Sequence, residues 1–215
     1  FSNSFRLMHI GIDFDNTIVC YDQIFHAAAA ERELIPAETP KSKQAVRNHL
    51  RRSGKEAEWI VLQGYVYGVK LAEAEAFPGL TEFMKKFASQ NIPLSIISHK
   101  TKTPYAGPAY DLHQSATNWI EAHPDISSNI TNFSFQETKL EKLRCIRSLG
   151  CTHFVDDLSE FLTEPDFPSD VTRLLFDPDR NNQDHAKYTR LHSWNDISTN
   201  LERTILDETN ALNGS

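Results

Sequence analysis

The sequence contains few cysteines, and their spacing does not suit a metal site. Its 215 residues include three cysteines, Cys20, Cys145 and Cys151, and no Cys-x-x-Cys pair. The usual zinc motifs are therefore excluded, and the nine histidines show no His-Glu-x-x-His pattern that would replace them. A sparse, odd set of cysteines is typical of a reducing compartment, where they pack as small apolar side chains.

Long apolar runs and an excess of positive charge are also missing. No apolar run approaches the length of a membrane span, and no stretch resembles a signal peptide. The net charge is -7, with 22 Lys and Arg against 29 Asp and Glu, which argues against a nucleic acid polymer as partner. We take Met8 as a candidate natural start and draw nothing from residues 1–7. We therefore expect a cytoplasmic protein that binds neither membrane nor nucleic acid polymer.

The motif that organises the chain lies near its N-terminus. Residues 9–19 read His-Ile-Gly-Ile-Asp-Phe-Asp-Asn-Thr-Ile-Val, an apolar run interrupted by acids. Such a run predicts a buried strand at the centre of a parallel sheet, with Asp13 and Asp15 at its carboxyl end, where α/β sheets bind ligands. Two carboxylates this close repel each other, and Mg²⁺ relieves that repulsion with oxygen ligands. The alternative is a solvated turn, which the apolar flanks make a poor fit.

Asp13, Asp15 and Thr17 match the Asp-x-Asp-x-Thr motif of the haloacid dehalogenase-like (HAD) superfamily position for position. This resemblance implies Asp13 as the nucleophile and Asp15 as the general acid and base. Dehalogenases of the superfamily lack the second aspartate, so Asp15 favours phosphoryl chemistry.

Residues 20–76 have a helical composition and no strand-like alternation of useful length. Ala27–Ala30 and Lys43–Arg52 favour helix, while Pro36 and Pro40 break it. In HAD proteins an insert at this place is a helical cap that closes over the active site. We therefore predict a cap over 20–76, and a Rossmann-like core over 1–19 and 77–215. The alternative is a purely structural helical subdomain.

A second apolar strand, Leu94–Ile97, ends at Ser98. The resemblance makes Ser98 the residue of the second HAD motif, whose hydroxyl can donate a hydrogen bond to a phosphoryl oxygen. The polar loop that follows, and two residues of the predicted cap, supply candidates to contact the substrate; the alternative is that they are solvated. These candidates are His99, Lys100, Lys102, Tyr105, Arg47 and Tyr65.

The remaining motif is a lysine-bearing helix followed by an acid pair. Thr138 and Glu141 have capping-box spacing, and the strand His153–Val155 ends in Asp156 and Asp157. The resemblance implies that Asp156 completes the Mg²⁺ site and that Asp157 holds metal-bound water or orients a lysine.

Two lysines compete for the role of the catalytic lysine of HAD proteins. We favour Lys142, which precedes Asp156 by 14 residues, over Lys139, which lies one turn earlier. The alternative is that both are solvated.

The resemblance implies an α/β fold: a doubly wound, mostly parallel, Rossmann-like sheet with helices on both faces. Further strands are expected at 130–135 and, as the last one, at 171–176, with a closing helix from His192. The function implied by the resemblance is a Mg²⁺-dependent phosphatase that hydrolyses a small phosphorylated metabolite, such as a sugar phosphate, through an aspartyl-phosphate. The alternatives are a nucleotidase or phosphotransferase (mutase) of the same fold and, less favoured, a non-catalytic protein that binds a phosphorylated ligand.

Overall fold

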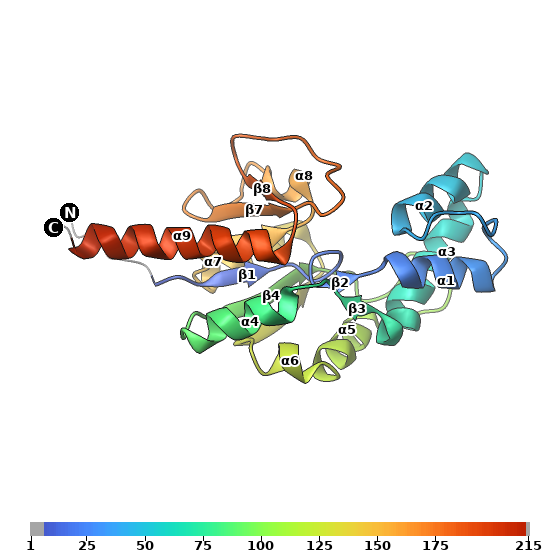
Figure 1. The fold of residues 1–215 in the computed structure, drawn as a ribbon. Coiled ribbons are helices and arrows are strands. Elements are labelled where there is room, and N and C mark those ends of the chain that lie inside the picture. The colour runs from blue at the N-terminus through green and yellow to red at the C-terminus, as the bar shows by residue number, and fades with distance from the viewer. Residues whose placement is uncertain (1–6, 214–215) are drawn as a thin grey trace.

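The computed structural model describes residues 7–213 and has a six-stranded sheet at its centre. All neighbouring strands in this sheet are parallel (Figure 1). The strands, in spatial order, are β5 (Asn132–Gln136), β4 (Leu94–His99), β1 (Ile10–Ile12), β6 (His153–Asp156), β7 (Thr172–Phe176) and β8 (Thr189–Leu191). Residues 1–6 and 214–215 of the predicted core lie outside the described residues.

Helices cover both faces of this sheet because its strands bury apolar residues on alternate sides. Leu174 and Phe176 belong to one hydrophobic cluster, and Leu175 between them belongs to a second. The first cluster contains side chains from α4 (Leu80–Ser89), α5 (Leu112–Glu121), α6 (Pro124–Ser127) and α9 (Trp194–Asn213). The second contains side chains from α7 (Lys139–Ser148) and α8 (Ser159–Leu162). The predicted doubly wound α/β fold is thus confirmed.

A helical insert, which we define as residues 21–74, follows the first strand of the sheet. It contains α1 (Asp22–Glu31), α2 (Lys43–Arg52), α3 (Glu56–Gly68) and the 3₁₀ helix η1 (Lys70–Glu73), and it lies beyond one end of the sheet (Figure 1). The chain enters it along β2 (Val19–Cys20) and leaves it along β3 (Glu75–Ala76), and these two strands pair antiparallel. The insert thus begins and ends at one point. Its division from the core at 20 and 76, and its role as a cap, stay predictions.

The insert also touches the core through two glycines of α3. A Cβ atom at Gly68 would lie 2.6 Å from Tyr110, and one at Gly64 would lie 2.7 Å from Pro104. Only glycine therefore lets α3 approach the 100–111 loop this closely. Ser115 strengthens the contact, because its hydroxyl donates to the carbonyl of Gly68 at 2.8 Å.

Two details at the C-terminal end differ from the sequence-based expectation. Residues 171–176 are not the last strand, because Thr189–Leu191 adds β8 at the sheet edge, pairing with β7. Three residues are too few to show a hydrophobic period in the sequence. This strand forms through its backbone hydrogen bonds to β7. The closing helix begins at Trp194 rather than at His192, because the Ser193 hydroxyl accepts a hydrogen bond from the Asp196 amide and caps it.

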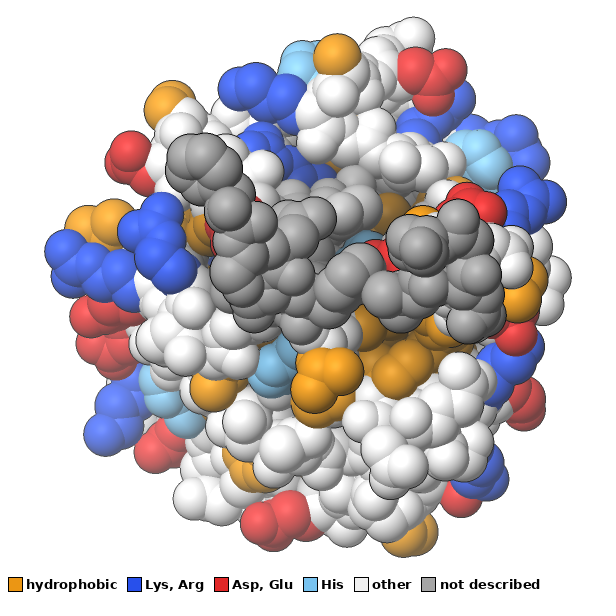
Figure 2. Space-filling view, turned by 90° about the vertical axis from the view of Figure 1, so that its left-hand side faces the viewer, with side chains coloured by type: hydrophobic (Ala, Val, Ile, Leu, Met, Phe, Trp, Pro, Cys, Tyr) orange, Lys and Arg blue, Asp and Glu red, His pale blue; other side chains and the backbone are white. Residues whose placement is uncertain are grey.

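The surface at the end where both chain termini lie carries charges of both signs. Lys and Arg side chains are interspersed there with Asp and Glu (Figure 2). Within residues 7–213, no helix combines the length and the hydropathy that crossing a membrane requires.

Candidate active site

The site lies where three neighbouring strands end. Asp13 follows β1, Ser98 lies near the end of β4, and Asp156 ends β6. Because these strands are adjacent and parallel, their carboxyl ends meet at one edge of the sheet. Just beyond β1 the chain turns at Asn16, whose φ is 59°. This turn brings Thr17 back, so that its hydroxyl donates to an Asp157 oxygen at 3.2 Å.

Lys142 bridges two buried acids, Asp13 and Asp156. Its Nζ lies 2.6 Å from Asp13 Oδ1 and 2.6 Å from Asp156 Oδ2, and the residue is only 2% exposed. The helix that carries it begins with the predicted capping box, formed by Thr138 and Glu141. Burial by itself lowers the pKa of Lys142, but the two carboxylates raise it above its ordinary value, so the amine is charged.

One lysine does not balance the negative charge of this cluster. Burial raises the pKa of Asp13 to about 7, Lys142 opposes this, and the charge of Asp156 adds to it. Burial, with the charges of Asp156 and Asp13, also raises the pKa of Asp157 well above its ordinary value. Ligand oxygens of these three aspartates all lie within 4.8 Å of one another. A set of carboxylate oxygens with uncompensated charge fits a hard divalent cation such as Mg²⁺.

Asp15 is held by residues from both sides of the site. Lys100, at the end of β4, places its Nζ 2.8 Å from one Asp15 oxygen and 3.0 Å from the other. The hydroxyl of Tyr21, the first residue of the helical insert, donates to the same carboxylate. Asp15 therefore depends on the insert as well as on the core for its orientation.

Ser98 carries an unused hydroxyl. The residue is 1% exposed, and its Oγ has no hydrogen-bond partner among residues 7–213. Buried polar groups are normally paired. The free hydroxyl therefore marks a place where a ligand oxygen can be bound.

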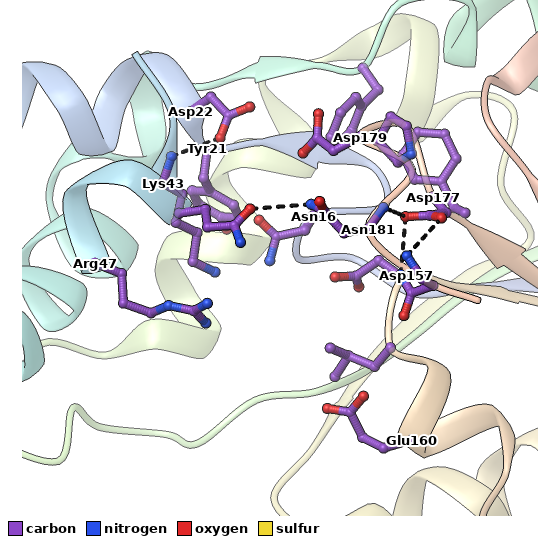
Figure 3. A pocket seen from close by; sticks show the side chains of 16 residues that line it. Asn16, Tyr21, Asp22, Lys43, Arg47, Asp157, Glu160, Asp177, Asp179 and Asn181 are labelled. Atoms are coloured by element: carbon purple, nitrogen blue, oxygen red, sulfur yellow. Dashed lines mark hydrogen bonds between the residues drawn. The ribbon is translucent and has the colours of Figure 1, made fainter. Parts of the chain in front are cut away.

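A cavity of about 420 Å³ lies beside these residues, between the helical insert and the core (Figure 3). One wall is formed by α2 with Lys43, Gln44 and Arg47, and the opposite wall includes Asp157 and Asp177. The full lining is Asn16, Tyr21, Asp22, Lys43, Gln44, Arg47, Phe77, Asp157, Leu158, Glu160, Phe176, Asp177, Pro178, Asp179, Asn181 and Asn182.

The structure separates the predicted substrate contacts into two groups. Lys100 reaches Asp15 and Arg47 lines the cavity, whereas the other four do not line it. His99 is exposed with its ring nitrogen 3.1 Å from the Glu137 carbonyl, Lys102 is exposed, and Tyr105 is 84% exposed. Tyr65 packs under the guanidinium of Arg32, 4.0 Å from the ring centre.

Lys139 lies at the surface, where it forms an ion pair of 3.2 Å with Glu164. Of the two candidate lysines, only Lys142 contacts Asp13. The catalytic roles given to these residues stay predictions.

Sequence reasoning missed two residues at the site. Tyr21 directly follows a short apolar stretch and resembles any core aromatic, and Lys43 opens a helix rich in basic residues. Nothing in their sequence context distinguishes them, because both reach the site only through the way the insert packs.

The arrangement of elements is similar to that of solved structures at low sequence identity. A protein from Clostridium acetobutylicum described as a predicted phosphatase matches with a TM-score of 0.61 at 11% identity, over 92% of this chain and 99% of that one. A protein from Bacillus subtilis described as a HAD-hydrolase bound to magnesium matches with a TM-score of 0.52 at 10% identity, over 91% of this chain and 99% of that one. A protein described as an L-2-haloacid dehalogenase matches with a TM-score of 0.55 at 12% identity, over 91% of this chain and 99% of that one.

No protein-family model and no curated protein matches the sequence. The solved structures show that the chain has the fold of HAD-superfamily hydrolases.

Proposed function

We propose that this protein is a Mg²⁺-dependent phosphatase of the cytoplasm that hydrolyses a small phosphorylated metabolite. The observation that carries the proposal is the position of Lys142, 2.6 Å from both Asp13 and Asp156, with Asp15 two residues beyond Asp13. This combination supplies a nucleophile, a cation beside it and a separate acid at one edge of the sheet.

The metal would be held by Asp13 and Asp156, with the backbone carbonyl of Asp15 as a further oxygen ligand and Asp157 close by. Bound Mg²⁺ would neutralise charge on the phosphoryl oxygens. Ser98, with its free hydroxyl, would donate a hydrogen bond to one of those oxygens.

The chemistry then runs through the two aspartates of the motif. A carboxylate oxygen of Asp13 attacks phosphorus, the bond to the leaving oxygen breaks, and Asp15 gives that oxygen a proton. Asp15 next takes a proton from water, whose oxygen attacks phosphorus and breaks the bond to Asp13. Phosphate leaves and both aspartates return to their starting state. Lys142 offsets negative charge near the phosphoryl group.

Asp15 also bears on dehalogenation, the activity of one of the matched proteins. A halide leaves a carbon atom as a stable anion and needs no proton, whereas an alkoxide does. Asp15, positioned by Lys100 and Tyr21, would supply that proton from its protonated form and so serves the second reaction. A nucleotidase or phosphotransferase would use the same groups with another leaving group or acceptor.

The test follows label from ¹⁸O-water during turnover of a panel of phosphomonoesters with Mg²⁺. We expect labelled free phosphate from the natural protein. Asp13→Asn should lower the rate by about 10⁴-fold or more, while Asp125→Asn, a change at an exposed aspartate paired with Lys85, should not. Phosphate passed to a second metabolite, with none released to water, would indicate a phosphotransferase. Turnover by a folded Asp13→Asn protein would remove Asp13 from the mechanism.

A second measurement identifies the covalent step. With p-nitrophenyl phosphate, whose leaving group needs little protonation, the Asp15→Asn protein should still be phosphorylated but should hydrolyse the product slowly. Mass spectrometry should then find one phosphoryl group on Asp13. A protein that turns over without ever carrying it contradicts the aspartyl-phosphate route.

A further inference from the structure

Two cations of the helical insert face the cavity from one side. Lys43 and Arg47 are four residues apart on α2, so they lie one turn apart on the same face of the helix. Both line the cavity, and the guanidinium of Arg47 points into the space in front of Asp157 and Glu160 (Figure 3). Helix α2 therefore presents a positive wall to the acidic edge of the sheet, although Asp22 of α1 also lines the cavity.

Neither cation has an acidic partner. Within residues 7–213, no carboxylate lies at ion-pair distance from Lys43 or Arg47. The Nζ of Lys43 donates to the hydroxyl of Tyr67 at 2.9 Å. The Nε of Arg47 is buried and has no hydrogen-bond partner among the described residues. Arg51, one turn further along α2, pairs with Glu56 at the surface instead. Burying a cationic N–H donor without a hydrogen-bond partner costs free energy. A bound anion is the group that would lower this cost most.

The opposite wall of the cavity is acidic, and two of its carboxylates already accept hydrogen bonds within the protein. The carboxylate of Asp177 accepts hydrogen bonds from the amides of Asn181 and Asn182. Asp157 accepts one from Thr17 and lies in the acidic cluster. Glu160 and Asp179 also line this side, so an anion in the cavity is repelled from the core wall and drawn to α2. The side chains of Gln44 and Asn181 meet at 3.2 Å and join the two walls.

We propose that Lys43 and Arg47 bind a second anionic group, carried on the leaving group of the substrate. The substrate class is thus a small phosphomonoester that bears a carboxylate or a second phosphoryl group. The reacting phosphoryl group lies at Asp13, and the second anion lies against α2 across the cavity. The kinetic test of this inference rests on the proposed phosphatase function, whereas the binding test does not.

Three probes with a common three-carbon skeleton test the proposal. Glycerol 3-phosphate has a neutral leaving group, 3-phosphoglycerate has a carboxylate in place of the free hydroxymethyl group, and glycerol 1,3-bisphosphate adds a second phosphoryl group. We expect the natural protein to prefer one or both anionic probes over glycerol 3-phosphate in kcat/KM. Calorimetric binding to the Asp13→Asn protein with Mg²⁺ should give the same order. Which of the two anionic probes is preferred distinguishes a carboxylate from a phosphoryl group.

The variant that decides the matter is Arg47→Gln. It should reduce the preference for the anionic probes over glycerol 3-phosphate, measured as a ratio of kcat/KM values, about tenfold. Arg52→Gln removes the same charge from an exposed position on the same helix and should leave the preference unchanged. Arg47→Lys should restore part of it.

An unchanged preference in Arg47→Gln, or equal treatment of the three probes by the natural protein, overturns the proposal. So does a lack of binding by all three. Preferential binding without hydrolysis of any probe would instead overturn the phosphatase function and leave the anion subsite standing.

Discussion

Lys142 is a buried cation between two buried carboxylates, and its removal should be costly. Lys142→Met leaves Asp13 and Asp156 facing each other without a counter-charge. We expect a loss of about 3–5 kcal/mol in the free energy of unfolding, together with loss of phosphatase activity. Lys139→Met breaks only the half-exposed pair with Glu164 and should cost less than about 1 kcal/mol. Urea unfolding of both variants measures this. Equal effects would mean that Lys142 is not buried between the acids.

His153 gives the protein a predictable weakness in acid. Burial lowers the pKa of this imidazole from 6.5 to about 4. Between pH 6.5 and pH 4 the imidazole of His153 is therefore protonated in the unfolded chain but neutral in the folded chain. The free energy of unfolding falls as the pH drops through this range. We expect a loss of about 2–3 kcal/mol from this residue over that range.

His153→Gln should flatten this part of the pH profile, measured by urea unfolding at several pH values. His185→Gln, at an exposed position, should not. A profile equally steep in both variants would assign the acid sensitivity to other groups.

At this scale the sequence indicated which acids lie together and that Lys142 accompanies them, but not which residues hold Asp15. Asp13 and Asp156 could be found because each ends an apolar strand, a local pattern. Lys142 could be preferred to Lys139 on spacing. The contacts of Lys100 and Tyr21 with Asp15 could not be found, because they depend on how the 100–111 loop and the insert fold back over the sheet.

Among the elements, α3 offers a sharp test of how the insert is attached. Alanine at Gly68 would favour the helix by up to about 1 kcal/mol, but its Cβ would lie 2.6 Å from Tyr110. We expect the crowding to dominate and the free energy of unfolding to fall by about 1–3 kcal/mol.

The matched background is Tyr110→Gly, which removes both the Cβ atom and the ring that obstruct a Cβ at residue 68. Gly68→Ala should be nearly neutral or stabilising there, and denaturant unfolding of all four proteins completes the cycle. The same cost in both backgrounds would show that α3 and the 100–111 loop do not touch in solution.

Elements with a clear hydrophobic period were predictable, and those held by backbone pairing were not. The Phe83, Met84 and Phe87 stripe of α4 and the Thr138 cap of α7 are visible in the sequence. The edge strand β8 and the β2–β3 pair are two or three residues long. Strands of that length exist only because a partner strand lies beside them.

For the molecule as a whole, Mg²⁺ should act as a stabilising ligand. A cation that binds the folded chain alone raises stability by about 2.7 kcal/mol at 100 times its Kd. We expect Mg²⁺ to raise the melting temperature, and Asp156→Asn to remove most of that rise. Sodium chloride at equal ionic strength is the control. A rise of equal size with sodium chloride, or in the variant, would contradict a specific site, as would full phosphatase activity after exhaustive chelation.

The class of the fold followed from the resemblance of the motifs at Asp13, Ser98, Lys142 and Asp156 to those of HAD proteins. The order β5-β4-β1-β6-β7-β8 did not, because it depends on pairings between residues far apart, such as Ile12 with Val155.

The short β2–β3 pair makes residues 21–74 an exchangeable cassette. Cys20 and Glu75 face each other across this ribbon, so the segment departs from the core and returns to it at adjacent points. A tight hairpin turn, or a different set of helices, could be spliced between them without rethreading any strand of the parallel sheet. The acidic cluster would stay with the core, whereas Tyr21, Lys43 and Arg47 would leave with the cassette. In this architecture the residues proposed to select the substrate can be inherited separately from the acidic cluster, provided that a new segment again supplies a donor to Asp15 where Tyr21 does so here.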